Sequence, residues 1–271
     1  MKKSLTALAA VTALSFSASA NADVVVDLFN VNQAAITDYS NDGNGVWSTI
    51  TGAPTTSVIG GVRELYVERV GGTAAEDPDF GRVLAGVNAD RYIFNSDTDV
   101  AGTGILRWDG AGIAGVSSPA TFASNARGYG LGADLSSYTS FLFDVLSADQ
   151  GFKFSIGVYK SAAEYSIITL TSSGGAGLRT ISLGAFLAPS GDYDDPFNPG
   201  ADLNVNVLNV GFDPADFLTV GALEAVINVG GGTLAVDLSL NQVTAVPEPA
   251  SLALVGLGLL GLGAIRRRKA S

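Results

Sequence analysis

Two stretches of alternating side chains limit what this chain can fold into. Residues 152–159, FKFSIGVY, have an apolar side chain at every second position, and so do residues 233–241, TLAVDLSLN. Successive side chains of a β-strand point to opposite faces, so a period of two predicts half-buried strands, as found in antiparallel sheets. The side chains expected to face the core are Phe152, Phe154, Ile156, Val158, Leu234, Val236, Leu238 and Leu240.

Nine further stretches are predicted to be strands, and Gly, Asn, Asp or Pro clusters separate many of them. No stretch shows a helical period over three turns, although 160–165 and 213–218 are long enough for one helical turn each. The 34 glycines, against a single methionine, indicate short segments joined by turns. The further expected strands are 24–29, 62–70, 90–95, 103–108, 140–147, 165–171, 178–183, 204–211 and 223–229.

Many short strands without long helices predict an all-β fold, an antiparallel two-sheet sandwich. The length is about twice that of one immunoglobulin domain of roughly 100 residues. No proline-rich linker divides the chain near its middle. A jelly-roll-like sandwich is therefore favoured over immunoglobulin-like domains.

The stretch LGADLSSYTSFLFDVLSADQGFKFSIGVY, residues 131–159, places a polar segment before a strand of the form FxFDV. This arrangement resembles the strand pairs of carbohydrate-binding jelly rolls. The resemblance extends over residues 131–241. It implies a sandwich of that kind, in which the first and last strands lie together.

The N-terminus has the layout of a secretory signal. Lys2 and Lys3 form a positive region, residues 5–16 form an apolar one, and Ala20-Asn21-Ala22 is an A-x-A cleavage site. The mature chain is expected to start near Asp23, with a cut after Ala20 as the alternative. The leader would form a signal helix.

The C-terminus has an apolar run followed by basic residues. Residues 250–265 carry no charge, and as a helix they would span about 24 Å, somewhat less than a bilayer core of roughly 30 Å. Snorkelling arginines make up part of the difference. The basic stop, Arg266, Arg267, Arg268 and Lys269, would hold this end in the cytoplasm. Pro247 and Pro249 keep the segment before this transmembrane helix extended.

An extended motif, a short span and a basic stop together resemble the PEP-CTERM sorting domain. The matching residues are Val246, Pro247, Glu248 and Pro249, the Leu/Gly-rich run and Arg266–Arg268. The resemblance implies processing by an exosortase, a membrane transpeptidase of Gram-negative bacteria that make extracellular polysaccharide. An ordinary single-pass anchor is the alternative. The chain then divides into a signal peptide (1–22), a sandwich domain (23–245) and a sorting signal (246–271).

Charge and composition exclude several functions. Six of the 15 basic residues lie in the two end segments, so residues 23–246 hold 9 basic residues against 25 of the 26 acids, a net charge of −16. Such a surface repels phosphate backbones, so no nucleic acid partner is expected. The chain has no Cys and no His, which excludes disulfides, thiolate or Ser-His-Asp catalysis and metal sites of imidazole or sulfur.

Sites of oxygen ligands remain, and two sets of aspartates are candidates for calcium. The first is the loop GDYDDPFNPGAD, with Asp192, Asp194 and Asp195. The second is Asp27 with Asp237, which the resemblance to carbohydrate-binding jelly rolls would bring together on the first and last strands. Solvated acidic surface is the alternative for both sets.

The role that these features favour is a secreted, non-catalytic protein of the cell surface or of a polysaccharide-rich extracellular matrix or biofilm. It would be exported, transiently anchored in the inner membrane before processing, and could then associate with glycans. The candidate aromatic faces for sugar stacking are those of Trp47, Trp108, Tyr129, Tyr138 and Tyr159. The ring of Tyr159 is expected to be exposed. The alternative is a polysaccharide-active enzyme, a glycoside hydrolase or lyase using paired carboxylates.

Overall fold

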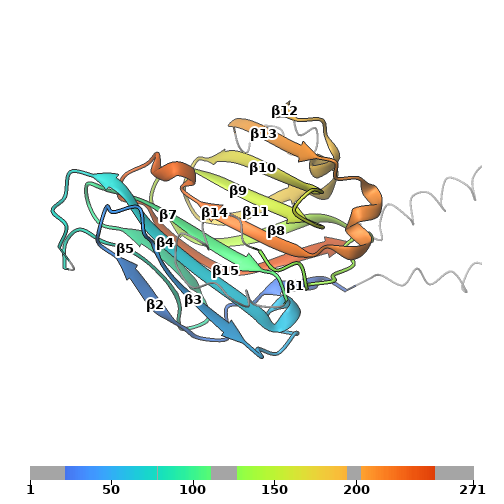
Figure 1. Ribbon diagram of the computed structural model, residues 1–271, viewed down its shortest axis with the longest axis horizontal. Coiled ribbons are helices and arrows are strands. Elements are labelled where there is room, and N and C mark those ends of the chain that lie inside the picture. Colours follow the sequence, from blue (N-terminus) through green and yellow to red (C-terminus); the bar gives the residue numbers. More distant parts are fainter. Residues whose placement is uncertain (1–21, 78, 111–126, 194–202, 248–271) are drawn as a thin grey trace, which may run out of the picture. The chain divides into compact units, whose positions relative to one another are not determined.

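The computed structural model describes residues 22–77, 79–110, 127–193 and 203–247. Within it, Asp23–Val246 form one compact unit. The described residues contain fifteen strands in two antiparallel sheets, shown in Figure 1. The predicted all-β two-sheet sandwich is therefore confirmed.

The seven-stranded sheet has the order β11-β8-β15-β6-β5-β2, and β1 pairs with β15. β15, the last strand of the chain, thus lies in the interior of this sheet. β1 pairs with the C-terminal part of β15. The strands are β1 (Val24–Asp27), β2 (Gln33–Asp38), β5 (Val83–Val87), β6 (Tyr92–Ser96), β8 (Tyr138–Ala148), β11 (Gly177–Ser182) and β15 (Asp237–Pro247).

The eight-stranded sheet has the order β12-β13-β10-β9-β14-β7-β4-β3. Its strands are β3 (Val46–Thr51), β4 (Val62–Gly72), β7 (Val100–Trp108), β9 (Phe152–Tyr159), β10 (Tyr165–Ser172), β12 (Gly191–Tyr193), β13 (Leu203–Val210) and β14 (Ala222–Ile227). Short 3₁₀ turns connect some strands: η1 (Ile59–Gly61), η2 (Leu183–Leu187), η3 (Pro214–Thr219) and η4 (Val229–Gly231).

The core lies between the two sheets. Phe143 of β8 meets Phe154 of β9 edge to face, with ring centroids 5.2 Å apart. Phe152, Ile156 and Val158 are also buried, as the alternation in β9 predicts. The inward side chains of both sheets therefore form one hydrophobic layer.

A charged group is also buried in the sandwich. Arg63 of β4 forms an ion pair with Asp27 of β1 at 2.9 Å, and both side chains are fully buried. Trp108 donates from Nε1 to the same carboxylate at 2.8 Å, and Arg63 Nε donates to Gln33 of β2 at 2.9 Å. These contacts join the two sheets, because β1 and β2 belong to one and β4 and β7 to the other.

Each of the eleven expected strands overlaps an observed one, and η3 confirms the helical turn expected at 213–218. No sequence pattern predicted β2, β3, β5 or β12. In β2 and β5, Ala or Gly occupies outward positions, so the contrast between the two faces disappears.

Two local expectations are wrong. Residues 160–164 form no helical turn: they are a tight connection in which Lys160 N donates to Glu164 O. The strand expected from Thr233 starts only at Asp237, because Ala235 has a φ of 53° and Leu234 is exposed. A left-handed residue interrupts a strand even where the hydrophobic pattern continues.

Candidate functional site

A row of charged side chains crosses the outer face of the eight-stranded sheet. Glu64 of β4 lies opposite Arg107 of β7, which lies opposite Glu224 of β14. Their neighbours Leu65, Leu106 and Leu223 point into the core, so the charged residues point away from it.

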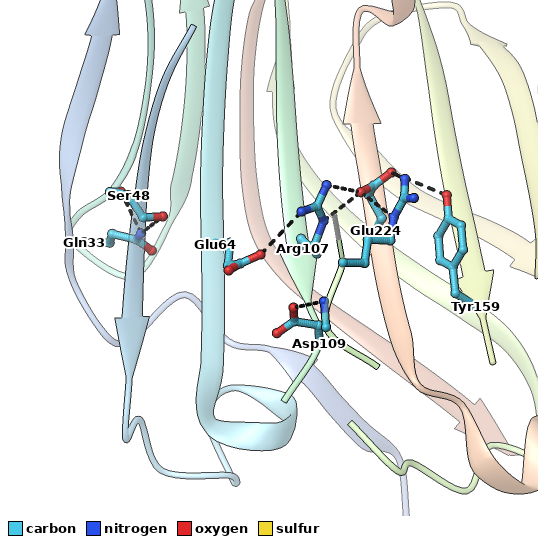
Figure 2. Close-up of polar contacts among 9 residues, drawn as sticks. Gln33, Ser48, Glu64, Arg107, Asp109, Tyr159 and Glu224 are labelled. Carbon is cyan, nitrogen blue, oxygen red and sulfur yellow. Dashed lines mark hydrogen bonds and ion pairs between the residues drawn. The ribbon is translucent and has the colours of Figure 1, made fainter. Parts of the chain in front are cut away.

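The row is a connected network of ion pairs, shown in Figure 2. Arg107 donates from Nε and Nη2 to Glu224 Oε2, each at 2.8 Å, and its Nη1 lies 3.6 Å from Glu64 Oε2. A second arginine, Arg127, binds Glu224 with both Nη2 (2.5 Å to Oε1) and Nε (3.0 Å to Oε2). Two carboxylates thus balance two guanidinium groups.

The return of the chain after β7 places Arg127 on this face. Gly128 N donates to Asp109 Oδ2 at 2.8 Å, and Gly130 N donates to Asp109 O at 2.9 Å. Asp109 directly follows β7, so these bonds fix residues 127–130 beside the end of that strand.

Tyr159 of β9 completes the cluster. Arg127 lies over its ring at 4.1 Å, and the Tyr159 hydroxyl donates to Glu224 Oε1 at 3.4 Å. The ring lies back over Gly157, where a Cβ atom would be 2.4 Å from a ring carbon. Tyr165 stacks on Tyr159 with ring centroids 5.5 Å apart.

The network fixes the charge state of Glu224. Burial by itself would raise the pKa of this carboxyl, but the charges of Arg107 and Arg127 outweigh burial and lower it below 4.5. Burial raises the pKa of the Tyr159 hydroxyl, and the negative charge of Glu224 adds to this. At neutral pH the cluster therefore holds an ionised glutamate beside a neutral tyrosine.

A second row on the same face is aromatic at one end. Trp47 of β3 lies opposite Tyr66 of β4, and Ile105 and Val226 continue the row. Tyr66 is buried and donates to Glu68 Oε2 at 2.9 Å, whereas Trp47 is half-buried. Trp47 and Val226, both half-buried, are thus the parts of this row that a ligand could reach.

The other aromatic candidates have different positions. Trp108 is a core residue bound to Asp27. Tyr159 is buried, which corrects the expectation that its ring is exposed: β9 is an interior strand, and Arg127 lies over the ring. Tyr129 and Tyr138 are half-buried.

Asp27 and Asp237 do not come together. The first and last strands pair as expected, but Asp27 lies opposite Val243, whereas Asp237 lies opposite Asn95 at the other end of β15. Six residues of extended strand separate these positions, about 20 Å. Asp27 is also fully buried, and burial raises its pKa while Arg63 and Trp108 oppose the shift. The expected calcium pair is therefore wrong.

Of the loop candidates, Asp192 is exposed on β12 and accepts a hydrogen bond from Asn206 Nδ2 at 3.4 Å. Asp194 and Asp195 lie outside the described residues, so calcium binding by this loop stays a prediction. Elsewhere, the part of the chain that the structure describes contains no group of three or more acidic side chains placed to hold a metal ion.

No sequence motif marks Glu64, Arg107, Arg127 or Glu224 as site residues. One signal was available: Glu224 stands in the apolar strand ALEAVI, and Arg63 and Glu64 stand in VRELYV. A charged residue within a short apolar strand must find a partner when it is buried. Which partner it finds depends on the pairing of β4, β7 and β14, which the sequence does not show.

At the C-terminal end of the unit, Val246 and Pro247 close β15, and Thr139 Oγ1 donates to Val246 O at 3.3 Å. No helix among the described residues is long and apolar enough to cross a membrane. The expected span 250–265 and the residues Ala20, Glu248, Pro249, Arg266, Arg267, Arg268 and Lys269 lie outside the described part.

Residues 245–269 match the family model described as the PEP-CTERM protein-sorting motif. The chain carries a PEP-CTERM sorting motif. The match spans the Pro-Glu-Pro residues, the apolar run and the basic stop. A PEP-CTERM motif implies processing by an exosortase, export and sorting to the cell surface.

The comparisons with curated proteins and with solved structures identify no further family for the chain. The curated proteins contain no significant match to this PEP-CTERM chain. A solved structure described as PfGH50B is 6% identical with a TM-score of 0.41, and the match covers 62% of this chain but only 22% of that one. The family 11 carbohydrate-binding module from Clostridium thermocellum, in complex with a beta-1,3-1,4-mixed-linked tetrasaccharide, is 13% identical with a TM-score of 0.30, over 80% of this chain and 96% of that one. At TM-scores this low, neither likeness bears on the function of this chain.

Proposed function

We propose that this protein is an exported, non-catalytic component of the cell surface or of an extracellular polysaccharide matrix, delivered through its PEP-CTERM tail. The observation that carries the proposal is the sorting motif at residues 245–269, which begins within the last strand of the sandwich. A Gram-negative host, a biofilm setting and association with extracellular glycan belong to this proposal.

The arrangement of the strand ends supports processing at both termini. Val24 pairs with Ala245 and Val25 with Thr244, so the first and last strands meet side by side. This pairing also supports a jelly-roll form of the sandwich. A signal helix in residues 1–22, cut after Ala22 or Ala20, and a transmembrane helix in residues 250–265 would then join neighbouring strand ends.

The chemistry of the charged row supports a non-catalytic role. Glycoside hydrolysis needs one carboxyl group with a raised pKa and another that reaches the substrate. Glu64 and Glu224 lie on either side of Arg107, both are buried, and the pKa of Glu224 is lowered. Glu224 is therefore a poor general acid, and neither buried carboxylate is accessible as a nucleophile.

The test is the intact mass of the protein from cells that contain an exosortase. We expect a mature chain that starts at Asp23 or close to it and lacks Arg266 to Lys269. A matched control replaces Pro247, Glu248 and Pro249 with Ala, Gln and Ala, and should retain the basic tail. A wild-type protein that keeps its basic tail in such cells would contradict exosortase sorting and leave an ordinary anchor.

A further inference from the structure

A shallow groove lies on the outer face of the seven-stranded sheet, opposite to the side that carries the core. Phe94 and Leu238 point into the core, so Asn95, Asp237 and Ser239 point outward. The groove extends over β5, β6 and β15 with a volume of about 500 Å³, and Arg82, Arg91 and Ile93 also line it. This volume lies in the usual range of roughly 300–1,000 Å³ for ligand sites.

The groove continues beyond Ile93. A second hollow of about 360 Å³ shares Ile93 and lies over β2 and β5. Its floor is formed by small residues, since Ala35 fills the space where a Cβ on Gly86 would lie. The two hollows are neighbours on the sheet, because Ile93 lines both.

The polar groups of the groove have unused hydrogen-bond donors. Arg82 Nε is buried without a hydrogen bond and lies 3.5 Å from Asp97 Oδ2, which is too long for one. Arg91 is exposed and forms no ion pair with any residue that the structure describes. Ser239 Oγ is buried at 7% residue exposure and has no partner. A buried polar atom without a partner costs free energy, which a ligand can recover.

Each of the two carboxylates in the groove accepts a hydrogen bond from a neighbouring group. Asp97 Oδ2 accepts a hydrogen bond from Arg82 N at 3.1 Å, and Asp237 Oδ1 accepts one from Asn95 Nδ2. The donors without a partner on Arg82 and Ser239, and the exposed Arg91 guanidinium, are groups that an acceptor can bind. A carboxylate supplies acceptors alone, and guanidinium groups bind it through paired hydrogen bonds.

The two arginines are unusual in this domain. Of the nine basic residues in 23–246, Arg63, Arg69 and Arg107 are buried and bound to other groups. Arg127 is bound to Glu224 and Lys160 to Asp216. The groove also holds two carboxylates, Asp97, which forms an ion pair with Arg82, and Asp237, so its charges balance, while Arg91 forms no ion pair with a described residue.

We propose that the groove formed by Arg82, Arg91, Asn95, Asp237 and Ser239 binds an acidic polysaccharide, a chain of uronate sugars. The Arg91 guanidinium binds a carboxylate, Arg82 contributes a second donor, and Ser239 and Asn95 contact ring hydroxyls. The apolar face of a sugar packs on Ile93. The proposal rests on the proposed glycan association and gives it a site and a ligand class.

The net charge of −16 repels a polyanion at long range, but salt at about 0.15 M screens charges beyond roughly 8 Å. Binding is therefore measured at that salt concentration, by calorimetric titration of the full chain in mild detergent. The ligand is an oligogalacturonate, and its fully methyl-esterified form is the neutral control of equal length.

We expect the oligogalacturonate to bind, and esterification to weaken binding at least tenfold. Arg91→Gln should weaken it at least tenfold, and Ser239→Ala severalfold. Lys153→Gln removes one exposed positive charge from the other sheet and should change the affinity less than twofold. Arg91 is exposed, so the melting temperature of Arg91→Gln should match that of the wild type.

Absence of oligogalacturonate binding, or equal binding of the esterified form, would overturn the proposal. Equal losses of oligogalacturonate affinity in Arg91→Gln and Lys153→Gln would also overturn it. If Trp47→Ala abolishes binding and Arg91→Gln does not, the glycan contact lies on the eight-stranded sheet: the groove is then wrong, while glycan association stands. Failure of exosortase sorting shows separately, in the mass of the mature chain.

Discussion

At the residue scale, the domain shields several of its few basic side chains from solvent. Arg63 binds Asp27 between the sheets, and Arg107 and Arg127 bind Glu224 on the outer face. Removing one partner of a buried pair leaves an uncompensated charge, which costs about 3–5 kcal/mol. These residues are therefore fixed by their partners.

Replacing Glu224 with Gln should destabilise the protein by about 3–5 kcal/mol at pH 7, because two guanidinium groups lose their counter-charge. The pKa of Glu224 is lowered in the folded state, so its contribution is present above pH 4.5 and is lost as the pH falls through the folded pKa. The difference in unfolding free energy between wild type and variant should thus shrink in acid. Denaturant titrations from pH 7 down to pH 3 measure it.

Glu164→Gln is the control, since Glu164 forms a surface pair with Lys160 and its side chain is 42% exposed. It should change stability by less than about 1 kcal/mol at any of these pH values. A Glu224→Gln penalty that stays the same between pH 7 and pH 3 would contradict the lowered pKa.

At the element scale, a glycine in the interior strand β9 leaves space for an aromatic ring two residues further along. Gly157 leaves room for the Tyr159 ring, which also contacts Arg127 and Tyr165. Glycine within a strand is otherwise unfavourable, and it often marks a close approach of another group.

Gly157→Ala should displace the Tyr159 ring and its contact with Arg127, and should destabilise the protein by about 1–3 kcal/mol despite the better strand propensity of alanine. Thermal unfolding followed by circular dichroism measures the loss. Ser155→Ala, at the previous outward position of β9, should have a smaller effect. If Gly157→Ala is as stable as the wild type, the ring is not held in this position.

At the scale of the whole molecule, the first and last strands of the chain pair with each other and complete the seven-stranded sheet. β15 lies between β8 and β6 and also pairs with β1, which is more than 200 residues away in sequence. The sorting motif overlaps the end of this strand. A cut at or beyond Glu248 leaves every residue of the strand in place.

Truncation after Pro247 should therefore leave the melting temperature within about 2 °C of that of the full chain. Truncation after Val243 removes Thr244 and the fully buried Ala245 together with their pairing to β1. We expect a loss of about 2–3 kcal/mol, which for a domain of this size lowers the melting temperature by roughly 5–10 °C. Equal melting temperatures of the two truncated chains would show that this strand end does not stabilise the fold.

The sequence by itself determined what depends on local patterns. The period of two determined β9 and most other strands, and the Pro-Glu-Pro residues with the basic stop determined the sorting motif. The tertiary structure decided which strands are neighbours. It placed Asp27 beside Arg63 instead of Asp237, covered Tyr159 with Arg127, and gathered Glu64, Arg107 and Glu224 in one row. The physical reason is that alternation fixes the face on which a side chain lies, whereas pairing across distant strands fixes its neighbours, and burial and charge state follow from the neighbours.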